Sequence, residues 1–316
     1  MDKDFIEEYV QINGIEQYFL HLKNDSKDVV VMLHGGPGLA NSYLAYAQQP
    51  YWDFCNVVYY DQRGAGKTQI KNQSKGSSLT FDVLLEDLRQ TIAYLREKYN
   101  PYRIFLAGHS WGSMLGTQYI LKYPTDVDGY IGYGQAVPSK EQDRHYYEFV
   151  KAAVMQSGNQ EQIDIISQVD KHFPDIPRED YFEQYNIIAG LGFGHGYDFM
   201  AADVFEIYGN SPTWTEEDEA ISEIVEKLNE KLYAEELYDW KVPDGAEYAV
   251  PVYYILGRYD EMTSSVIAAK YFEEIKAPKK KLYWIENAGH LLDTDNPKEF
   301  FAAMKDIVCG VDETII

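Results

Sequence analysis

A serine flanked by glycines is the first feature of this sequence that could do chemistry. Residues 107–116 read AGHSWGSMLG, so Ser110 stands at the centre of the pattern G-x-S-x-G, directly after the apolar run RIFL. When a strand precedes this pattern and a helix follows it, the serine lies on a sharp turn with its hydroxyl exposed. The free amides and positive dipole end of that helix would stabilise negative charge beside the hydroxyl. Ser110 is therefore a candidate nucleophile, if other residues supply a base and an acid.

Two later residues fit those roles. The stretch VYYILGRYD places Asp260 just past a predicted strand, where the catalytic loops of open α/β sheets gather. The stretch KLYWIENAGH places His290, one of seven histidines, after another predicted strand. The order serine, aspartate, histidine is that of an α/β-hydrolase triad. In such a triad the serine attacks a carbonyl carbon, the histidine moves its proton, and the aspartate orients the imidazole. This chemistry requires no metal and no organic cofactor.

The run LHGGPG after an early strand could supply an oxyanion hole. Its glycines, Gly35 and Gly36, can bring backbone N–H groups close to a bound carbonyl, and Pro37 stiffens the loop. The second donor would be the backbone N–H of Trp111, next to the nucleophile. The loss of one such donor costs roughly 3–4 kcal/mol of transition-state stabilisation in other enzymes.

The elements around these residues predict an α/β sheet. Several strand-like apolar runs lack alternation and are separated by helical patterns, which favours a mostly parallel sheet covered on both faces. Asn13-Gly14 predicts a hairpin, and a helix is expected from Thr80, as N-cap, to Asn100-Pro101. Residues 135–247 show helical stretches and no convincing buried strand. We therefore predict a hydrolase domain in residues 1–134 and 248–316, with residues 135–247 inserted as a helical cap.

Composition excludes some partners. The net charge is −23, which disfavours binding to nucleic acid or an anionic membrane surface. No apolar run approaches the roughly 20 residues of a membrane helix, and the charged start MDKDFIEEYV lacks the apolar core of a signal peptide. We expect a cytoplasmic protein of undetermined oligomeric state. The two cysteines, Cys55 and Cys309, are expected to be buried free thiols.

Taken together, the motifs HGGPG, YYDQRGAGKT, AGHSWGS, GRYD and NAGH resemble those of the proline iminopeptidases, a branch of the α/β hydrolases. The combination of HGGPG with DQRGAGKT is specific to that branch. The resemblance covers the predicted hydrolase domain and implies Ser110, Asp260 and His290 as the triad. It also implies Gly36 and Trp111 as the oxyanion donors, a helical cap over the site, and release of an N-terminal residue, usually proline, from a small peptide.

The predicted cap departs from that family. Proline iminopeptidases grip the substrate's free amine with cap carboxylates, often in a Trp/Glu motif, and residues 135–247 hold no clear W-x-x-W-E equivalent. The turn around Ser110, which we call the elbow, reads GHSWGS, where many members have GGSWGS. The candidate amine-binding carboxylates are Glu183, Asp198, Asp203 and Glu206. A carboxylesterase or small-amide hydrolase with the same triad stays open as an alternative, and so does a non-catalytic binding module on the same scaffold.

The run GAGKT resembles the end of a phosphate-binding loop, but the required earlier glycine is Asp61 and a helix is not expected to begin at once. We therefore do not expect nucleotide binding. Arg63 is expected to brace the loops beside the site, His34 to shape the oxyanion loop, and His195 to line the pocket. The remaining histidines show no metal-ligand spacing.

Overall fold

The core of the chain is one eight-stranded sheet, and six of its strands are parallel. The computed structural model describes residues 5–73, 79–137, 139–196 and 206–310. The strand order is β1-β2-β4-β3-β5-β6-β7-β8, in which the pairs β1–β2 and β2–β4 are antiparallel and the other pairs are parallel. The strands are β1 (Phe5–Ile12), β2 (Ile15–Leu22), β3 (Val29–Leu33), β4 (Asn56–Tyr60), β5 (Ile104–Ser110), β6 (Gly129–Gln135), β7 (Val252–Gly257) and β8 (Lys280–Ile285). The predicted mostly parallel α/β sheet is confirmed.

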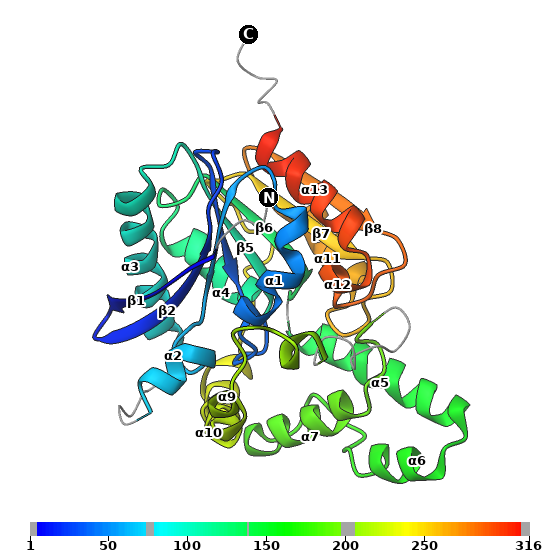
Figure 1. The fold of residues 1–316 in the computed structure, drawn as a ribbon. Helices are drawn as coiled ribbons and strands as arrows, with labels where there is room; N and C mark the ends of the chain where they lie inside the picture. The colour runs from blue at the N-terminus through cyan, green and yellow to red at the C-terminus, as the bar shows by residue number, and fades with distance from the viewer. Residues whose placement is uncertain (1–4, 74–78, 138, 197–205, 311–316) are drawn as a thin grey trace.

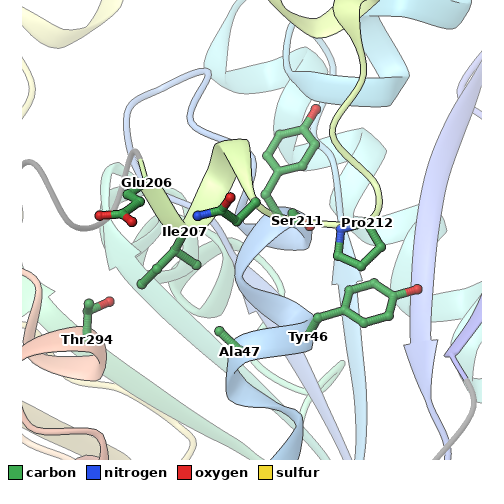
Figure 2. Close-up of a pocket in the computed structure, with 9 residues that line it drawn as sticks. Tyr46, Ala47, Glu206, Ile207, Ser211, Pro212 and Thr294 are labelled. Atoms are coloured by element: carbon green, nitrogen blue, oxygen red, sulfur yellow. The ribbon is translucent and has the colours of Figure 1, made fainter.

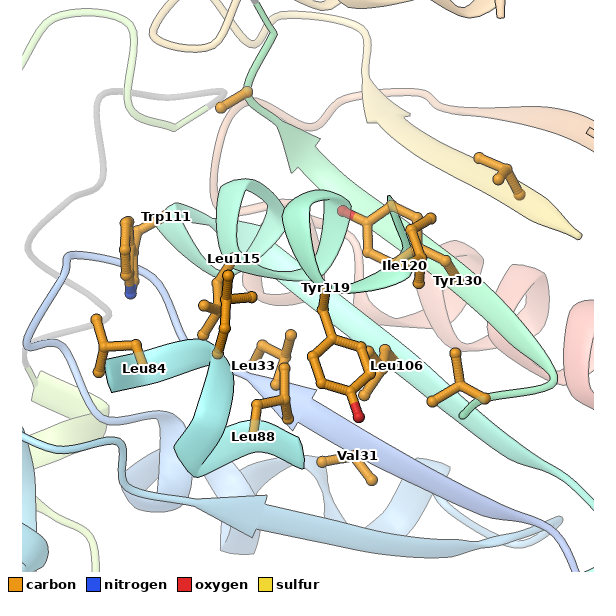
Figure 3. Close-up of a cluster of buried hydrophobic side chains, with 14 of the residues drawn as sticks. Val31, Leu33, Leu84, Leu88, Leu106, Trp111, Leu115, Tyr119, Ile120 and Tyr130 are labelled. Carbon is orange, nitrogen blue, oxygen red and sulfur yellow. The ribbon is translucent and has the colours of Figure 1, made fainter. Parts of the chain in front are cut away.

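Helices cover both faces of this sheet because its inner strands are apolar on both faces. Every residue of β3, β4 and β6 is buried. On one face α3 (Phe81–Tyr99), α4 (Trp111–Lys122) and α11 (Ser265–Glu274) share a core with the strands. Figure 3 shows Leu115 and Tyr119 of α4 packed among Leu84 and Leu88 of α3 and the strand side chains. The opposite face carries α1 (Ala45–Gln48), α12 (Leu292–Asp295) and α13 (Pro297–Cys309).

The turn and helix-cap residues predicted from the sequence occupy those positions in the structure. Asn13 and Gly14 both have positive φ, 45° and 84°, as the tight turn between β1 and β2 requires. The Thr80 side chain caps α3 by accepting a hydrogen bond from the Val83 amide. Asn100 ends that helix in the left-handed conformation, with φ 44°.

The described residues between β6 and β7 include a helical insertion, which we define as residues 139–196 and 206–237. Figure 1 shows its helices gathered beyond one end of the sheet. They are α5 (Ser139–Ser157), α6 (Gln160–Ile166), α7 (Arg178–Gly190), α9 (Glu216–Ala220), α10 (Ser222–Leu232) and a π-helical turn, η3 (Tyr233–Leu237). Among the described residues of this segment there is no strand, and ten buried residues, including Tyr146, Val150 and Phe173, form a separate core. The cap boundaries at 135 and 247 stay a prediction.

Two sequence expectations need correction. Cys55 is buried as expected, but Cys309 at the end of α13 is exposed, because only one face of that helix packs against the sheet. A helix does begin within GAGKT, since α2 covers Gly66–Lys71. The stretch EEDEAISEIVEKLNEKLY is helical, divided at Ile221 into α9 and α10, and ends in η3. Short 3₁₀ helices, η1 (Asn41–Leu44) and η2 (Gln49–Tyr51), flank α1.

Candidate active site

Ser110 lies on a strained turn between β5 and α4. Its φ is +50° and its ψ is −117°, a conformation that L residues rarely adopt. The two motif glycines permit the turn. A Cβ on Gly108 would lie 2.4 Å from the carbonyl oxygen of Gly112, and one on Gly112 would lie 2.2 Å from that of Leu33. Both positions therefore tolerate only glycine, and the G-x-S-x-G pattern has a steric cause.

A buried serine ties this turn to the next strand. The Ser113 hydroxyl donates to the Ser110 carbonyl oxygen at 2.6 Å and accepts from the amide of Ala136 at 2.9 Å. The elbow is thus fastened just past the end of β6. A strained backbone persists only when its surroundings hold it in place, and this pair of hydrogen bonds is one of the restraints that do so.

Asp260 and His290 form a buried pair. The distance from Asp260 Oδ2 to His290 Nδ1 is 3.0 Å, and both residues are at most 5% exposed. Thr263 steadies the carboxylate through its backbone amide, at 2.9 Å from Oδ1, and its hydroxyl, at 2.8 Å from Oδ2. Burial by itself raises the pKa of Asp260, but the charge and hydrogen bond of His290 and the two donors of Thr263 hold it below its ordinary value. Asp260 therefore stays ionised beside the imidazole.

The structure brings this pair to the elbow. The His290 ring lies 4.8 Å, centroid to centroid, from the ring of His109, the residue before the nucleophile. A Cβ on Gly134, whose strand pairs with the end of β5, would be 3.1 Å from His290 Cε1. Within the described chain no hydrogen bond joins Ser110 Oγ to His290. Such contacts are often long without substrate and tighten when it binds.

The HGGPG loop passes directly over the elbow. A Cβ on Gly35 would lie 3.4 Å from Ser110 Cβ. Gly36 has φ +108°, and a Cβ there would lie 2.7 Å from the amide nitrogen of Gly38, so the loop requires glycine at this position. Trp111 begins α4, where a backbone N–H has no partner within the helix. The predicted oxyanion donors, Gly36 and Trp111, thus lie on the two segments that meet at Ser110.

His34 holds this loop as a neutral ring. The amide of Gln62 donates to His34 Nε2 at 3.1 Å, so Nε2 carries no proton. Nδ1 must then carry it, and it donates to the Gly35 carbonyl oxygen at 2.9 Å. Burial lowers the pKa of His34 to about 4, which keeps the ring neutral. His34 shapes the loop, in agreement with the sequence analysis.

The basic residues of DQRGAGKT serve structural contacts. Arg63 donates two hydrogen bonds to Asp87 on α3, at 2.8 and 2.9 Å, and one to the Asn13 carbonyl oxygen. Lys67 Nζ lies 2.6 Å from Asp218 Oδ2 and 3.1 Å from the Thr215 hydroxyl, both on the helical insertion. Arg63 therefore holds the β1–β2 hairpin against α3. Lys67 links the insertion to the sheet and its covering helices, which we call the sheet half.

The helical insertion contacts two loops near Ser110, the loop that carries His290 and the HGGPG loop. At the first loop the His195 carbonyl oxygen accepts the His290 amide at 2.7 Å, and His195 Nε2 lies 3.0 Å from the hydroxyl of Tyr146. At the second loop the Tyr233 hydroxyl donates to the Gly36 carbonyl oxygen at 3.3 Å. The Tyr185 ring lies between, 6.3 Å from that of Tyr146 and 5.9 Å from that of Tyr233. A row of aromatic rings thus runs from the HGGPG loop to the loop that carries His290, which we call the histidine loop.

Of the four predicted amine-binding carboxylates the structure describes two, and neither of these two contacts a residue of the predicted triad. Glu183, on α7, and Glu206 are both exposed, while Asp198 and Asp203 lie outside the described residues. Glu206 lines a surface pocket of about 590 Å³ with Tyr46, Ile207 and Pro212 (Figure 2), and none of the predicted triad residues lines it. Sequence reasoning missed Glu261, which follows Asp260 and lies 2.6 Å from His145 Nε2 on α5.

The part of the chain that the structure describes holds no group of three or more His, Cys, Asp or Glu side chains arranged to bind a metal ion. None of the described helices has the length and apolarity to cross a membrane.

Comparison with known proteins identifies the family. Residues 28–297 match the family model of the alpha/beta hydrolase fold, and the chain therefore belongs to that family of hydrolases. A probable aminopeptidase from Bacillus subtilis, YbaC, is 25% identical over 92% of this chain and 89% of its own length. A proline iminopeptidase from Saccharolobus solfataricus is also 25% identical, over 96% of this chain and 92% of its own. The resemblance to proline iminopeptidases is confirmed.

A solved structure agrees at the level of the fold. The proline iminopeptidase of Mycobacterium smegmatis superposes with a TM-score of 0.64 over 96% of this chain and 98% of its own, at 18% identity. At that identity the likeness concerns the fold alone, and it extends through the helical insertion as well as the sheet.

Proposed function

We propose that this α/β hydrolase is a serine hydrolase with Ser110 as nucleophile, His290 as general base and Asp260 as the residue that orients the imidazole. The observation that carries the proposal is the buried Asp260–His290 pair, 3.0 Å between Oδ2 and Nδ1, beside a serine on a strained strand-to-helix turn. Because Nδ1–H donates to Asp260, Nε2 is free to take the proton of the serine hydroxyl.

The reaction then runs in two halves. Ser110 Oγ attacks the substrate carbonyl carbon while His290 Nε2 takes the hydroxyl proton. The N–H groups of Gly36 and Trp111 stabilise the oxyanion of the tetrahedral intermediate, each contributing about 3–4 kcal/mol. His290 returns the proton to the leaving nitrogen or oxygen, and an acyl-enzyme remains. Water repeats the cycle and releases the acid.

The substrate class we favour is a small peptide with a free N-terminus, from which the enzyme releases a proline-like residue. Relatives named as aminopeptidases align with nearly the whole chain. The rings of Tyr185 and Tyr233, which lie 5.9 Å apart and are only partly buried, give an aromatic surface suited to a compact apolar ring. The helical insertion above the elbow would exclude long chains.

Glu261 is our candidate to bind the substrate's ammonium group. Its side chain is 31% exposed and carries a carboxylate on the same loop as Asp260. Its Cβ would be 3.2 Å from a Cβ on Gly194, next to the His195 carbonyl that holds the histidine loop. We expect Glu261→Gln to raise KM for a free-amine substrate and to leave the hydrolysis of p-nitrophenyl acetate unchanged. The control is Glu183→Gln, on the exposed face of α7, which should change neither.

Three substrates test the function: Pro-β-naphthylamide, its N-acetylated form, and p-nitrophenyl acetate. Each is compared between wild type, Ser110→Ala, and Ser167→Ala as a control at an exposed serine. An aminopeptidase cleaves the first, rejects the second, and loses activity only in Ser110→Ala. If the ester alone turns over and blocking the amine changes nothing, the chain is a carboxylesterase. If a fluorophosphonate probe fails to label Ser110, the catalytic proposal is wrong and a binding role is favoured.

A further inference from the structure

The residue before the nucleophile, His109, makes contacts that a packing role does not require. It pairs with Tyr133 in the β5–β6 ladder, and their rings stack with centroids 4.9 Å apart and planes 25° apart. The imidazole also lies 4.8 Å, centroid to centroid, from the ring of His290. His109 therefore contacts both the sheet and the candidate general base.

One hydrogen bond fixes the orientation and protonation of this ring. His109 Nε2 lies 2.9 Å from the backbone carbonyl oxygen of His290, and a carbonyl can only accept, so Nε2 carries a proton. Burial, together with the charge of His290, lowers the pKa of His109 to about 3. The ring is therefore neutral, with Nδ1 unprotonated. Nδ1 lies 3.0 Å from where a Cβ on Gly35 would be.

The His290 backbone is thus held from two directions. Its carbonyl accepts from His109 on the strand of the nucleophile, and its amide donates to the His195 carbonyl oxygen at 2.7 Å. The side chain is held separately by Asp260. Of these three restraints, the hydrogen bond from His109 is the one that links His290 to the residue next to Ser110.

We infer that His109 is a positioning residue: its Nε2–H anchors the His290 carbonyl to β5 and so sets the distance between base and nucleophile. This inference rests on the proposed function, since it concerns the same serine and histidine. A misplacement of about 1 Å in an active site can cost on the order of a hundredfold in rate. The anchor should therefore affect kcat much more than KM.

Three variants separate the hydrogen bond from the ring. Glutamine places an amide N–H at about the position of Nε2 and lacks the ring. Phenylalanine keeps the stacking ring and lacks the donor. Methionine lacks both and matches glutamine in length. We expect His109→Gln to keep kcat within about threefold of wild type, and His109→Phe and His109→Met to lower it about tenfold or more with KM within about twofold.

The pair Gln and Met decides the outcome, because it stands even if the phenylalanine variant does not fold. The measurement is kcat and KM for the best substrate found above, with melting temperatures to compare folding. Equal kcat values for the two would overturn the inference, as would a loss confined to KM. Failure of the proposed function is a separate result: wild-type Ser110 would then not be labelled by a fluorophosphonate. Labelled wild type with no difference between Gln and Met refutes the role of His109 alone.

Discussion

The sheet half and the helical insertion meet at the elbow, but they are held in different ways. At the ends of the parallel strands, backbone packs against backbone: a Cβ on Gly112 would lie 2.2 Å from the Leu33 carbonyl oxygen, and one on Gly257 equally close to that of Gly289. The insertion is held by side chains, such as the pair Lys67–Asp218 and the hydroxyl of Tyr233. Contacts between backbone segments tolerate almost no added atom, whereas contacts between side chains can be weakened gradually by substitution.

The largest effect is expected for Gly112→Ala. The added methyl group would meet backbone atoms that cannot move without shifting β3 or α4. We expect at least about a hundredfold loss of kcat, because the elbow itself is displaced. The measurement is turnover, with fluorophosphonate labelling of Ser110.

Gly190→Ala is the matched control on the insertion. A Cβ there has no atom within 4 Å, and the residue lies at the end of α7 without a positive φ. Activity should be unchanged, and stability unchanged or higher by about 0.5–1 kcal/mol. If the two alanine variants behave alike, the contrast between backbone and side-chain contacts fails.

The next effect is on stability. In Lys67→Met the carboxylate of Asp218, whose side chain is 2% exposed, loses its cation and keeps only neutral donors from Tyr43 and Thr215. Removal of one partner of a buried pair costs about 3–5 kcal/mol, and somewhat less here because the Lys67 side chain is 11% exposed. Thermal unfolding should show a loss of about 2–4 kcal/mol. The exposed pair Lys305–Asp53 supplies the control, since Lys305→Met should cost less than about 1 kcal/mol.

A smaller effect depends on pH and compares one buried aspartate from each region. Burial raises the pKa of Asp143 in the insertion to about 7, and that of Asp61 in the sheet half also to about 7. The unfolded chain has a pKa of about 3.9 at such a residue. Between these values the folded state holds a proton that the unfolded state has lost, so this contribution to stability falls as pH rises from about 4 to 7.

Asp143→Asn removes this titration and keeps an oxygen to accept from the Tyr181 hydroxyl. Relative to wild type, the variant should gain about 1 kcal/mol or more in unfolding free energy between pH 5 and pH 8. Denaturant unfolding at several pH values measures this difference, and parallel curves would contradict it. If Asp61→Asn shows the gain and Asp143→Asn does not, water reaches the core of the insertion more readily than that of the sheet.

The smallest effect is expected for Tyr233→Phe. Its hydroxyl donates a 3.3 Å hydrogen bond to the Gly36 carbonyl oxygen, and a single neutral hydrogen bond contributes about 0.5–1.5 kcal/mol. We expect a fall in kcat of no more than a few fold, with the melting temperature nearly unchanged. A loss comparable to that of Gly112→Ala would mean that the insertion, as well as the sheet, sets the oxyanion loop.

Sequence reasoning succeeded where local patterns have local causes. The glycines of G-x-S-x-G, the Asn13-Gly14 turn and the Thr80 cap each act within a few residues, and each is found as predicted. The positions of Asp260 and His290 could be predicted because residues after parallel strands converge at one edge of the sheet. Their role in catalysis stays a proposal.

Long-range pairings between side chains were not predictable. Nothing near Lys67 indicates that it pairs with Asp218, and nothing near Glu261 indicates that it lies against His145. Helix α7 has no continuous apolar stripe by which periodicity could place it, since Tyr181 and Ile188 are its buried residues. The departure of the elbow from GGSWGS was visible as a difference, but the bond from His109 to His290 became visible only when β5 and the histidine loop were placed together.

The insertion between β6 and β7 also delays the pairing of these two strands while the chain is being synthesised. All seven residues of β6 are buried in the finished sheet, partly by pairing with β7. A ribosome adds about 5–20 residues per second, so β6 waits on the order of ten seconds for its neighbour while the insertion is made. During that interval β6 is an unpaired edge, the kind of surface that recruits other chains. The β6 edge stays without this partner until residues 252–257 have been made.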